Sequence, residues 1–592
     1  MNSKLRFAFA IVLFAAACVI GSATQENKQT PPAQAEQSPV PTFSVGANLV
    51  IVPVIVTDKH GQHVPGLKTE DFEVKEEGAV QKIVRLDEVN ADDTLVKKEA
   101  AGDSKTFSNK LSAEHPKKLV IIALDQINTP FQNSSDGHRM LVDFLSKNVD
   151  ANTLIALVAL GQNGSHVIHD FTRSPAVLQA AVQKLKTSIS SRDALSQDLT
   201  GDNSQADIEV AQLTAILNGA DVPTSGSLAD MMAAARASGP ALRARADASR
   251  VAQNSLVTLE NFQQLALYFG GIPGRKSLVW ASTGFPFSLG AAPQSATRGT
   301  LIDDWQRTVR MLTDANIAVY PVDIGGLLPG ASANNIQSLN SSLIKSGSPD
   351  GGSGGRGQQM EGLSTGDYLD PSGARHETMR QVAEMTGGQP FYNSNDGREL
   401  FRRAGEDASQ YYMLSYYTKD TGKYTWRKLS VKVHHPDVKV RARSGFFFRN
   451  PGSENEGTRQ AEERMAVSSD LDFTAMPVSG TWQQTEPAGS QRRVHFILSV
   501  PAGVPFVDNE RQNHVSFDFM AVASDASGKI VAQVGQRLDT NLDAQSLAQV
   551  QGKGLDYSNA LTLPPGQYKV HFVVRDNLKG VIGSMSSPLK VE

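Results

Sequence analysis

Cysteine is almost missing from this sequence, which has one such residue, Cys18, among 592. A single cysteine excludes an intramolecular disulfide framework and the zinc or iron–sulfur sites that need several cysteines. A large excess of charge of one sign is missing too, because the sequence has 57 Lys and Arg residues and 61 Asp and Glu residues, for a net charge of −4. Without a basic stripe, nucleic acid is not an expected partner. Metal or catalytic chemistry would have to use oxygen and nitrogen groups.

Several catalytic signatures are also missing. The sequence contains no His-Glu-x-x-His segment of a zinc peptidase. The stretch from Gly270 to Ser277 looks like a phosphate-binding loop, but Arg275 interrupts the spacing, and the stretch follows a predicted helix instead of a strand. A calcium-loop-like segment at Asp539 lacks its turn glycine and its final glutamate. We therefore predict a protein that is not an enzyme.

The longest apolar run lies near the N-terminus. Basic residues precede the run 7–20, and small residues follow it up to Ala23. This pattern predicts a secretory signal peptide over residues 1–23. An alternative is a lipoprotein anchored through Cys18, which follows three alanines. We expect an exported protein, periplasmic or secreted, with no transmembrane helix in the mature chain, because no later apolar run is long enough to span a bilayer.

Composition divides the mature chain into modules. Residues 24–45 are rich in Gln, Pro, Ala and Ser, which is typical of a flexible linker. Alternating apolar residues over 46–90 predict a small β module that is too short to be stable alone. Residues 91–116 are polar and are expected to be a linker. A charged linker over 451–468 leads to residues 469–592, where short strands between turns predict an immunoglobulin-like β-sandwich.

Strand and helix patterns alternate between these two β modules. Residues 119–124 form a continuous apolar run, which is typical of a strand buried on both faces, and 153–160 and 317–324 repeat it. Apolar residues at helical spacing lie between such runs. We therefore predict an α/β fold class with a doubly wound, mostly parallel sheet. The Ala- and Ser-rich residues 187–250 and the Gly-rich residues 327–372 are expected to be insertions.

A polar segment, Asp125 to Thr129, directly follows the first buried strand, at the edge of the sheet where α/β proteins bind ligands. This segment and the order of the predicted strands together give the chain a pattern that resembles a von Willebrand factor type A domain. More narrowly, the pattern resembles the VWFA-related family known from acidobacterial genomes. Further segments carry this resemblance, namely Val54–Asp58, Asp71–Val74, Phe171-Thr172, Gly274–Val279, Asn316–Tyr320, Thr386–Gly388, Tyr411-Tyr412 and Ser444–Phe447. The resemblance covers residues 46–450 and implies a von Willebrand type A-like domain over residues 117–450.

The resemblance also implies a metal-ion-dependent adhesion site, built in that family from an Asp-x-Ser-x-Ser segment and a Thr and an Asp of later loops. Asp125 matches the first Asp and Thr129 the second hydroxyl. Ile127 stands where the first Ser belongs, and the later loop, Ser282-Thr283-Gly284, lacks its Asp. A single carboxylate holds a divalent cation such as Mg²⁺ or Mn²⁺ weakly, so the site is degenerate. Alternatively, Asp125 and Asn128 cap the following helix and hold the loop in place.

The expected partner-binding residues are those at this sheet edge: Asp125, Asn128, Thr129, Thr172 and Thr283, with Asp125 and Thr129 as candidate metal ligands. No cofactor is expected, apart from Mg²⁺ or Mn²⁺ under the metal hypothesis. The leading hypothesis is an exported, non-enzymatic binding or scaffolding protein whose protein partner lies in the cell envelope or outside the cell. A divalent-cation-dependent adhesion protein is the second hypothesis. The third is a hydrolase of envelope polymers, with the Gly-rich insertion as a lid.

Overall fold

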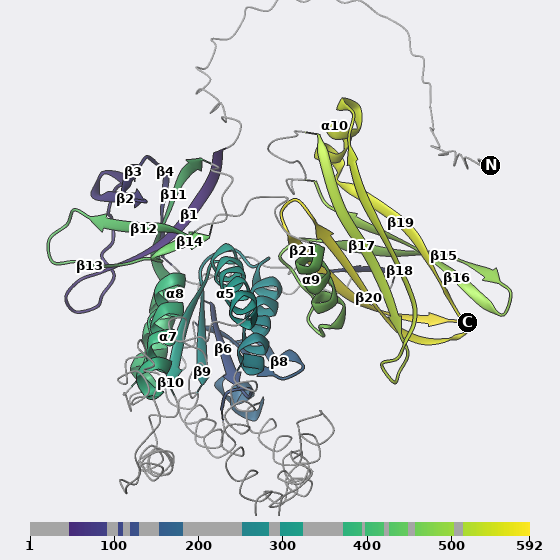
Figure 1. Cartoon of the computed structure of the whole chain (residues 1–592), viewed down its shortest axis with the longest axis horizontal. Helices are drawn as coiled ribbons and strands as arrows, with labels where there is room; N and C mark the ends of the chain where they lie inside the picture. Colours follow the sequence, from purple (N-terminus) through teal and green to yellow (C-terminus); the bar gives the residue numbers. More distant parts are fainter. Residues whose placement is uncertain are drawn as a thin grey trace, which may run out of the picture. The chain divides into compact units, whose positions relative to one another are not determined.

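A computed structural model describes residues 47–90, 105–109, 119–129, 153–181, 252–282, 296–323, 371–392, 397–419, 426–447, 456–502 and 513–592 (Figure 1). These residues form five β-sheets, of which four are antiparallel throughout. The predicted fold class, an α/β protein with a doubly wound, mostly parallel sheet, is therefore wrong, because antiparallel strands dominate the described chain. The prediction gave the long buried runs of one sheet more weight than the many short strands on either side.

The parallel strand pairs belong to one five-stranded sheet with the order β10-β9-β6-β7-β8. Its strands are β6 (Leu119–Asp125), β7 (Leu154–Gly161), β8 (Gly164–Thr172), β9 (Lys276–Ser282) and β10 (Ile317–Asp323). The pairs β10–β9, β9–β6 and β6–β7 are parallel, whereas β8 runs antiparallel to β7 at the edge. Every residue of β6 and β10 is buried, as their continuous apolar runs predict.

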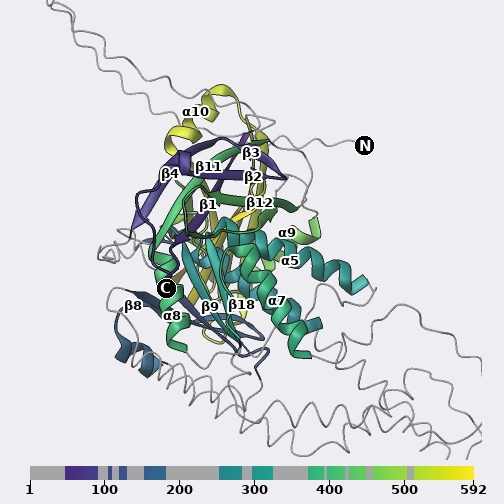
Figure 2. The same ribbon diagram turned by 90° about the vertical axis from the view of Figure 1, so that its left-hand side faces the viewer.

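Helices cover both faces of this sheet (Figure 1 and Figure 2). On one face, Leu119, Ile121 and Ala123 share a core with a helix over residues 252–269, with α5 (Ala296–Asp314) and with α7 (Pro371–Thr386). The alternate residues of β6 face α8 (Gly397–Ser409) and a helical turn near Leu178. The alternation follows from the two-residue period of a strand, which sends successive side chains to opposite faces.

The N-terminal β module is built from two distant parts of the chain. Its sheets have the orders β13-β1-β11-β4 and β14-β12-β2-β3, with a 3-10 turn (Thr69–Asp71) before β2. The strands are β1 (Ala47–Thr57), β2 (Phe72–Glu76), β3 (Ala79–Gln81), β4 (Ile83–Asn90), β11 (Gln410–Lys419), β12 (Trp426–Val433), β13 (Lys439–Arg441) and β14 (Gly445–Phe447). Val52 and Val54 of β1 pack against Tyr412 and Leu414 of β11. Residues 410–447 thus supply half of a module that was predicted from 46–90.

The C-terminal β-sandwich also takes a strand from elsewhere. Its sheets have the orders β19-β16-β15-β5 and β18-β17-β20-β21. The strands are β5 (Thr106–Ser108), β15 (Ser479–Ala488), β16 (Gln491–Val500), β17 (His514–Ser524), β18 (Ile530–Asn541), β19 (Leu555–Leu563), β20 (Gly566–Asp576) and β21 (Val581–Val591), with helix α10 (Ala544–Lys553) before β19. Phe496, Phe517 and Phe572 lie in its core. Strand β5 comes from residues that were expected to form a polar linker.

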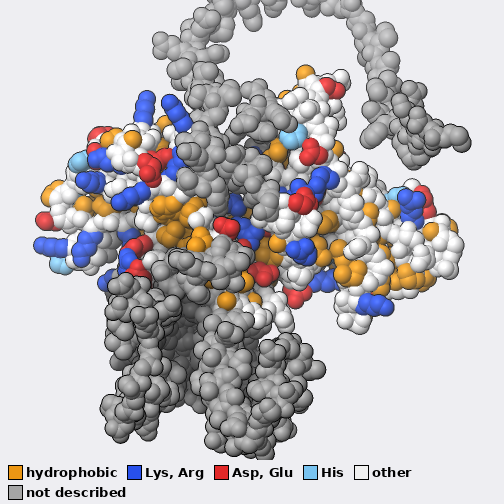
Figure 3. Space-filling model, viewed as in Figure 1, with side chains coloured by type: hydrophobic (Ala, Val, Ile, Leu, Met, Phe, Trp, Pro, Cys, Tyr) orange, Lys and Arg blue, Asp and Glu red, His pale blue; other side chains and the backbone are white. Residues whose placement is uncertain are grey.

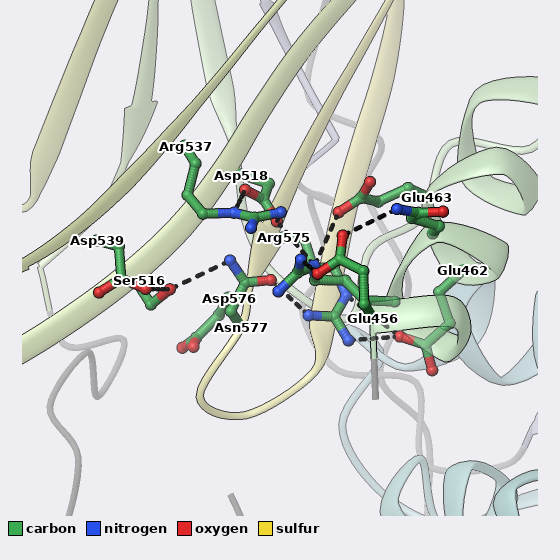
Figure 4. A network of polar contacts seen from close by, with 12 residues as sticks. Glu456, Glu462, Glu463, Ser516, Asp518, Arg537, Asp539, Arg575, Asp576 and Asn577 are labelled. Carbon is green, nitrogen blue, oxygen red and sulfur yellow. Dashed lines mark hydrogen bonds and ion pairs between the residues drawn. The ribbon is translucent and has the colours of Figure 1, made fainter. Parts of the chain in front are cut away.

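The expected linker 451–468 contains a helix, α9 (Glu456–Ser468), that is joined to the sandwich by buried polar contacts (Figure 4). The Arg575 guanidinium lies 2.7 Å from the Glu462 carboxylate, and both side chains are buried. Burial and the neighbouring Asp518 carboxyl raise the pKa of Glu463 to about 7. A buried ion pair contributes little net stability but is costly to break, so these contacts define where α9 docks.

Residues 469–478, here called the strap, join α9 to the sandwich and contact the helix over residues 252–269. The backbone N–H groups of Thr474 and Ala475 donate to the Leu267 carbonyl, and Gly271 N–H donates to the Thr474 hydroxyl at 3.0 Å. A Cβ atom on Gly271 would overlap Thr474. The glycines that look like part of a phosphate loop in the sequence therefore allow two backbones to approach closely.

Among the residues placed in the structure, no helix is both long and apolar enough to cross a membrane. On the face shown in Figure 3, basic and acidic side chains are interspersed. This distribution agrees with the near-balance of positive and negative residues in the sequence.

Candidate functional site

Three neighbouring parallel strands end in polar residues at the same edge of the five-stranded sheet. Strand β6 ends at Asp125, β9 at Ser282 and β10 at Asp323. Ser282 pairs with Asp323, and Leu124 pairs with Ala281, so that Asp125 and Ser282 are neighbours. In open sheets the carboxyl ends of parallel strands are where ligands bind. We call this group of residues the carboxyl edge and take it as the candidate site.

Asp125 is at the centre of a dense set of hydrogen bonds. One carboxylate oxygen accepts the backbone N–H groups of Ile127 and Asn128, both at 2.9 Å. The other oxygen accepts from Asn128 Nδ2 at 2.8 Å, from Trp280 Nε1 at 3.1 Å and from the Ser282 hydroxyl at 2.7 Å. Asp125 is only 4% exposed. Its carboxylate therefore holds the loop after β6 and the end of β9 together.

Burial raises the pKa of Asp125, while hydrogen bonds from Asn128 and Ser282 oppose that rise. A carboxylate has about four lone-pair positions, and five donors already occupy them. A divalent cation would have to replace donors such as the Trp280 indole N–H, which has no lone pair to offer a metal. The residues around Asp125 thus do not fit a Mg²⁺ or Mn²⁺ ion. They fit the alternative in which Asp125 fixes the loop.

The loop residues next to Asp125 are also held by contacts with the helix over residues 252–269 and with the core. Asn128 Nδ2 also donates to the Thr258 hydroxyl at 2.8 Å, and Thr258 belongs to the helix over residues 252–269. Ile127, which occupies the position of a missing metal ligand, is buried in the core. Thr129 is buried as well, at 9% exposure. Packing and hydrogen bonding thus position this loop without a metal.

The structure does not bring Thr172 to the carboxyl edge. Strand β8 runs antiparallel to β7, and Thr172 pairs with Ile155, whereas Asp125 pairs with Leu160 farther along the same strand. At about 3.3 Å per residue, the two positions are about 16 Å apart along β7. The expectation that Thr172 joins Asp125 is therefore wrong, since the edge strand runs in the opposite direction. Thr283 lies outside the described residues.

A histidine and a tyrosine that are not among the predicted site residues lie beside the end of β10. His376 of α7 is 2.8 Å from the Asp323 carboxylate, measured from Nε2. Its ring stacks on Tyr392, with the ring centroids 4.4 Å apart and the planes tilted by 14°. Tyr392 is 36% exposed, whereas Asp323 is buried. The one signal for this group in the sequence is that Asp323, like Asp125, ends a buried apolar run.

Comparisons with known proteins do not assign a family. No family model matches the chain, and no curated protein matches it. A glycosyl hydrolase family 2 member from Bacteroides cellulosilyticus has a TM-score of 0.15 and 11% identity, over 31% of this chain and 20% of that chain. A β-glucuronidase from Bacteroides uniformis has a TM-score of 0.14 and 10% identity, over 30% and 19%.

A third solved structure, Northeast Structural Genomics Consortium target SoR45, has a TM-score of 0.12 and 10% identity, over 19% of this chain and 82% of that chain. The matched region thus spans about a fifth of each of the two hydrolases. At these TM-scores the likeness supports no conclusion about fold or activity. The resemblance to the VWFA-related family stays a prediction from sequence.

Proposed function

We propose that this chain is an exported, non-enzymatic binding or scaffolding protein whose protein partner docks at the carboxyl edge, over Tyr392 and His376. The observation that carries the proposal is the stacked pair itself. Tyr392 is partly exposed and lies against His376, which is in turn held by the buried Asp323. A tyrosine that is already held in place loses little conformational entropy when a partner covers it, and tyrosine is enriched among the residues that dominate binding energies.

Export is the part of the proposal that depends on sequence alone. The basic, apolar and small-residue segments over residues 1–23 support it, and they lie outside the described residues. The partner would accordingly be a protein of the cell envelope or of the surroundings of the cell.

The test is capture of partners from envelope extract by the mature chain, compared with Tyr392→Ala. Loss of a hot-spot tyrosine should lower recovery of the specific partner by about tenfold. Tyr417→Ala is the matched control, because Tyr417 has a similar exposure, 38%, but lies on β11 of the N-terminal module. Equal capture by the two variants would contradict a partner site at the carboxyl edge.

The same capture with and without a chelator, and calorimetry with Mg²⁺ or Mn²⁺, separate this proposal from divalent-cation-dependent adhesion. Because five donors surround Asp125, we expect no heat of cation binding that depends on Asp125. Chelator-sensitive capture together with a binding heat that Asp125→Ala abolishes would support the adhesion hypothesis instead.

One observation favours the third hypothesis, an envelope hydrolase. A histidine oriented by a buried carboxylate, like His376 with Asp323, is the arrangement that general-base catalysis uses. Release of soluble fragments from envelope polymers by the mature chain, abolished in His376→Ala but retained in Tyr417→Ala, would support this candidate. We expect no such release.

A further inference from the structure

A short segment from the N-terminal half of the chain fills a groove in the C-terminal β-sandwich. Strand β5 pairs antiparallel with β15, with Thr106 opposite Thr481, Phe107 opposite Gly480 and Ser108 opposite Ser479. Backbone hydrogen bonds continue the ladder at both ends, from Asn109 N–H to the Val478 carbonyl and from Trp482 N–H to the Lys105 carbonyl. The segment is thus bound through its backbone, as an added strand is.

The groove has a pocket for the Phe107 ring. This ring stacks on Phe572, with centroids 5.0 Å apart, and lies 5.4 Å from Trp482. Gly480 forms the floor, because a Cβ atom there would overlap the Phe107 ring. The absence of a side chain at Gly480 therefore leaves room for an aromatic ring in this register.

A second pocket receives Asn109, which is 5% exposed. Its Nδ2 donates to the carbonyls of Phe473 and Met476, at 2.6 and 2.8 Å, and its Oδ1 accepts the Val478 N–H at 2.7 Å. All three partners are backbone groups of the strap. An amide side chain that both donates and accepts in this way is recognised specifically, since neither a carboxylate nor an apolar residue offers the same pattern.

We propose that this groove, between β15 and β21, is a peptide-binding site for an extended Phe-x-Asn segment, and that the Thr106–Asn109 segment of a second copy of this chain can occupy it. Every wall residue named above lies within residues 473–572, whereas the occupant comes from residues 105–109. Exchange of an identical strand between two copies preserves each of these contacts, which is why such swapping has a low cost. Attachment in the same chain favours the internal segment at low protein concentration.

Cross-linking tests the exchange directly. The Asn109 N–H donates to the Val478 carbonyl, and the Trp482 N–H donates to the Lys105 carbonyl. By the alternation of an antiparallel ladder, Ser108 and Ser479 between them form a pair of the non-hydrogen-bonded kind. Cα atoms of such a pair are about 4.5 Å apart, which is close enough for a disulfide. We would mix two full-length chains, each with Cys18→Ser, one carrying Ser108→Cys and the other Ser479→Cys. Oxidation should give a covalent dimer containing one chain of each kind, in an amount that rises with protein concentration.

Two controls make either result informative. Ser527→Cys in place of Ser479→Cys puts the thiol in a turn elsewhere on the sandwich and should give only the background of random cross-links. Both cysteines in one chain should form an internal disulfide. If the internal disulfide forms but the mixture stays at background at the highest concentration tested, the exchange between copies is refuted.

Peptide binding measures the affinity and selectivity of the groove directly. A fluorescent peptide with the sequence of residues 103–111 should bind the full chain carrying Phe107→Ala about tenfold more tightly than it binds the wild-type chain, whose groove is already filled. Peptides with the Phe or the Asn replaced by Ala should bind about tenfold more weakly. If Phe107→Ala does not fold, Asn109→Ala serves instead. A folded variant that discriminates between none of these peptides would overturn the proposal.

Discussion

At the scale of single residues, the burial of Asp125 indicates a structural role for a side chain that was predicted to be a metal ligand. Asp125 has the position of a metal ligand in the sequence, but it is enclosed by five donors from the loop after β6, Trp280 and Ser282. An aspartate with so many donors stabilises its loop. Its removal leaves donors in the core that had been matched to an acceptor.

We predict that Asp125→Ala lowers the free energy of unfolding by about 1.5–3 kcal/mol, because it leaves buried neutral donors without their acceptor. Urea unfolding followed by circular dichroism measures it. Asp58→Ala is the control, because Asp58 accepts two backbone hydrogen bonds in an exposed turn, where water can replace the lost acceptor, so its removal should cost much less. Equal losses for the two variants, or a wild-type chain that Mg²⁺ stabilises through Asp125, would contradict this role.

His571 should make the free energy of unfolding depend on pH. Burial lowers its pKa to about 4, and Nε2 donates to the Ala466 carbonyl of α9. Because the unfolded chain has the ordinary pKa of about 6.5, the unfolded state binds more protons between pH 4 and 6.5. The stability due to neutral His571 is therefore complete above pH 6.5 and is lost as the pH falls towards 4, by about 3 kcal/mol in total.

The His571→Gln variant isolates this effect, since glutamine does not titrate. Urea unfolding at pH 7 and pH 4.5 should show a smaller difference for His571→Gln than for the wild type. His60→Gln, at an exposed turn, should keep the wild-type difference. Asp472 acts in the opposite sense, because burial raises its pKa to about 6, but it is present in all three proteins and cancels.

At the scale of elements, two buried runs were predicted well and one pairing was not. Strands β6 and β10 are buried on both faces, and continuous apolar runs identify such strands in a sequence. The direction of β8 was missed although the sequence contains its signal. Only residues 162–163 separate β7 from β8, and so short a connection allows an antiparallel hairpin but not a parallel crossover. Taking that connection into account would have placed Thr172 at the opposite end.

The contact between the strap and the helix over residues 252–269 gives the third prediction. Gly271→Ala should lower the free energy of unfolding by about 1–3 kcal/mol, because the new methyl group overlaps Thr474. Gly552→Ala is the matched control. It lies in α10 with open space around its Cα, so the same change should raise stability by about 0.5–1 kcal/mol. Thermal unfolding of the two variants should therefore shift in opposite directions, and a Gly271→Ala chain as stable as the wild type would rule out the close approach.

At the scale of the whole molecule, the long-range pairings could not be predicted from one sequence. Strand β5 has three residues and therefore no periodicity that would identify it. The contact of His376 with Asp323 and the pairing of β1 with β11 join residues that local patterns do not relate. Sequence patterns report which residues are buried and how the chain alternates locally. They do not report which of many compatible strands become neighbours.

Glu76 and Arg427 test how the two distant parts of the N-terminal module depend on each other. Their side chains form a buried ion pair between β2 and β12, at 2.7 Å. Arg427→Met leaves the Glu76 carboxylate buried without its main partner and should cost about 3–5 kcal/mol. Glu76→Leu combined with Arg427→Met should recover most of that loss.

Hydrogen exchange is the measurement for this pair. In Arg427→Met, exchange should speed up together over residues 72–76 and 426–433, because they belong to one cooperative unit. Faster exchange in only one of these strands would show that the two parts of the module are stable independently.

The two-part construction of the N-terminal module has a consequence for biosynthesis. Residues 91–409 must be made after β4 and before β11, its partner. At about 5–20 residues per second, synthesis of that stretch takes on the order of tens of seconds. For this whole period the valines of β1, which are buried against β11 in the finished protein, have no sheet to join. A newly made chain should therefore depend on a holding chaperone until its synthesis is nearly complete.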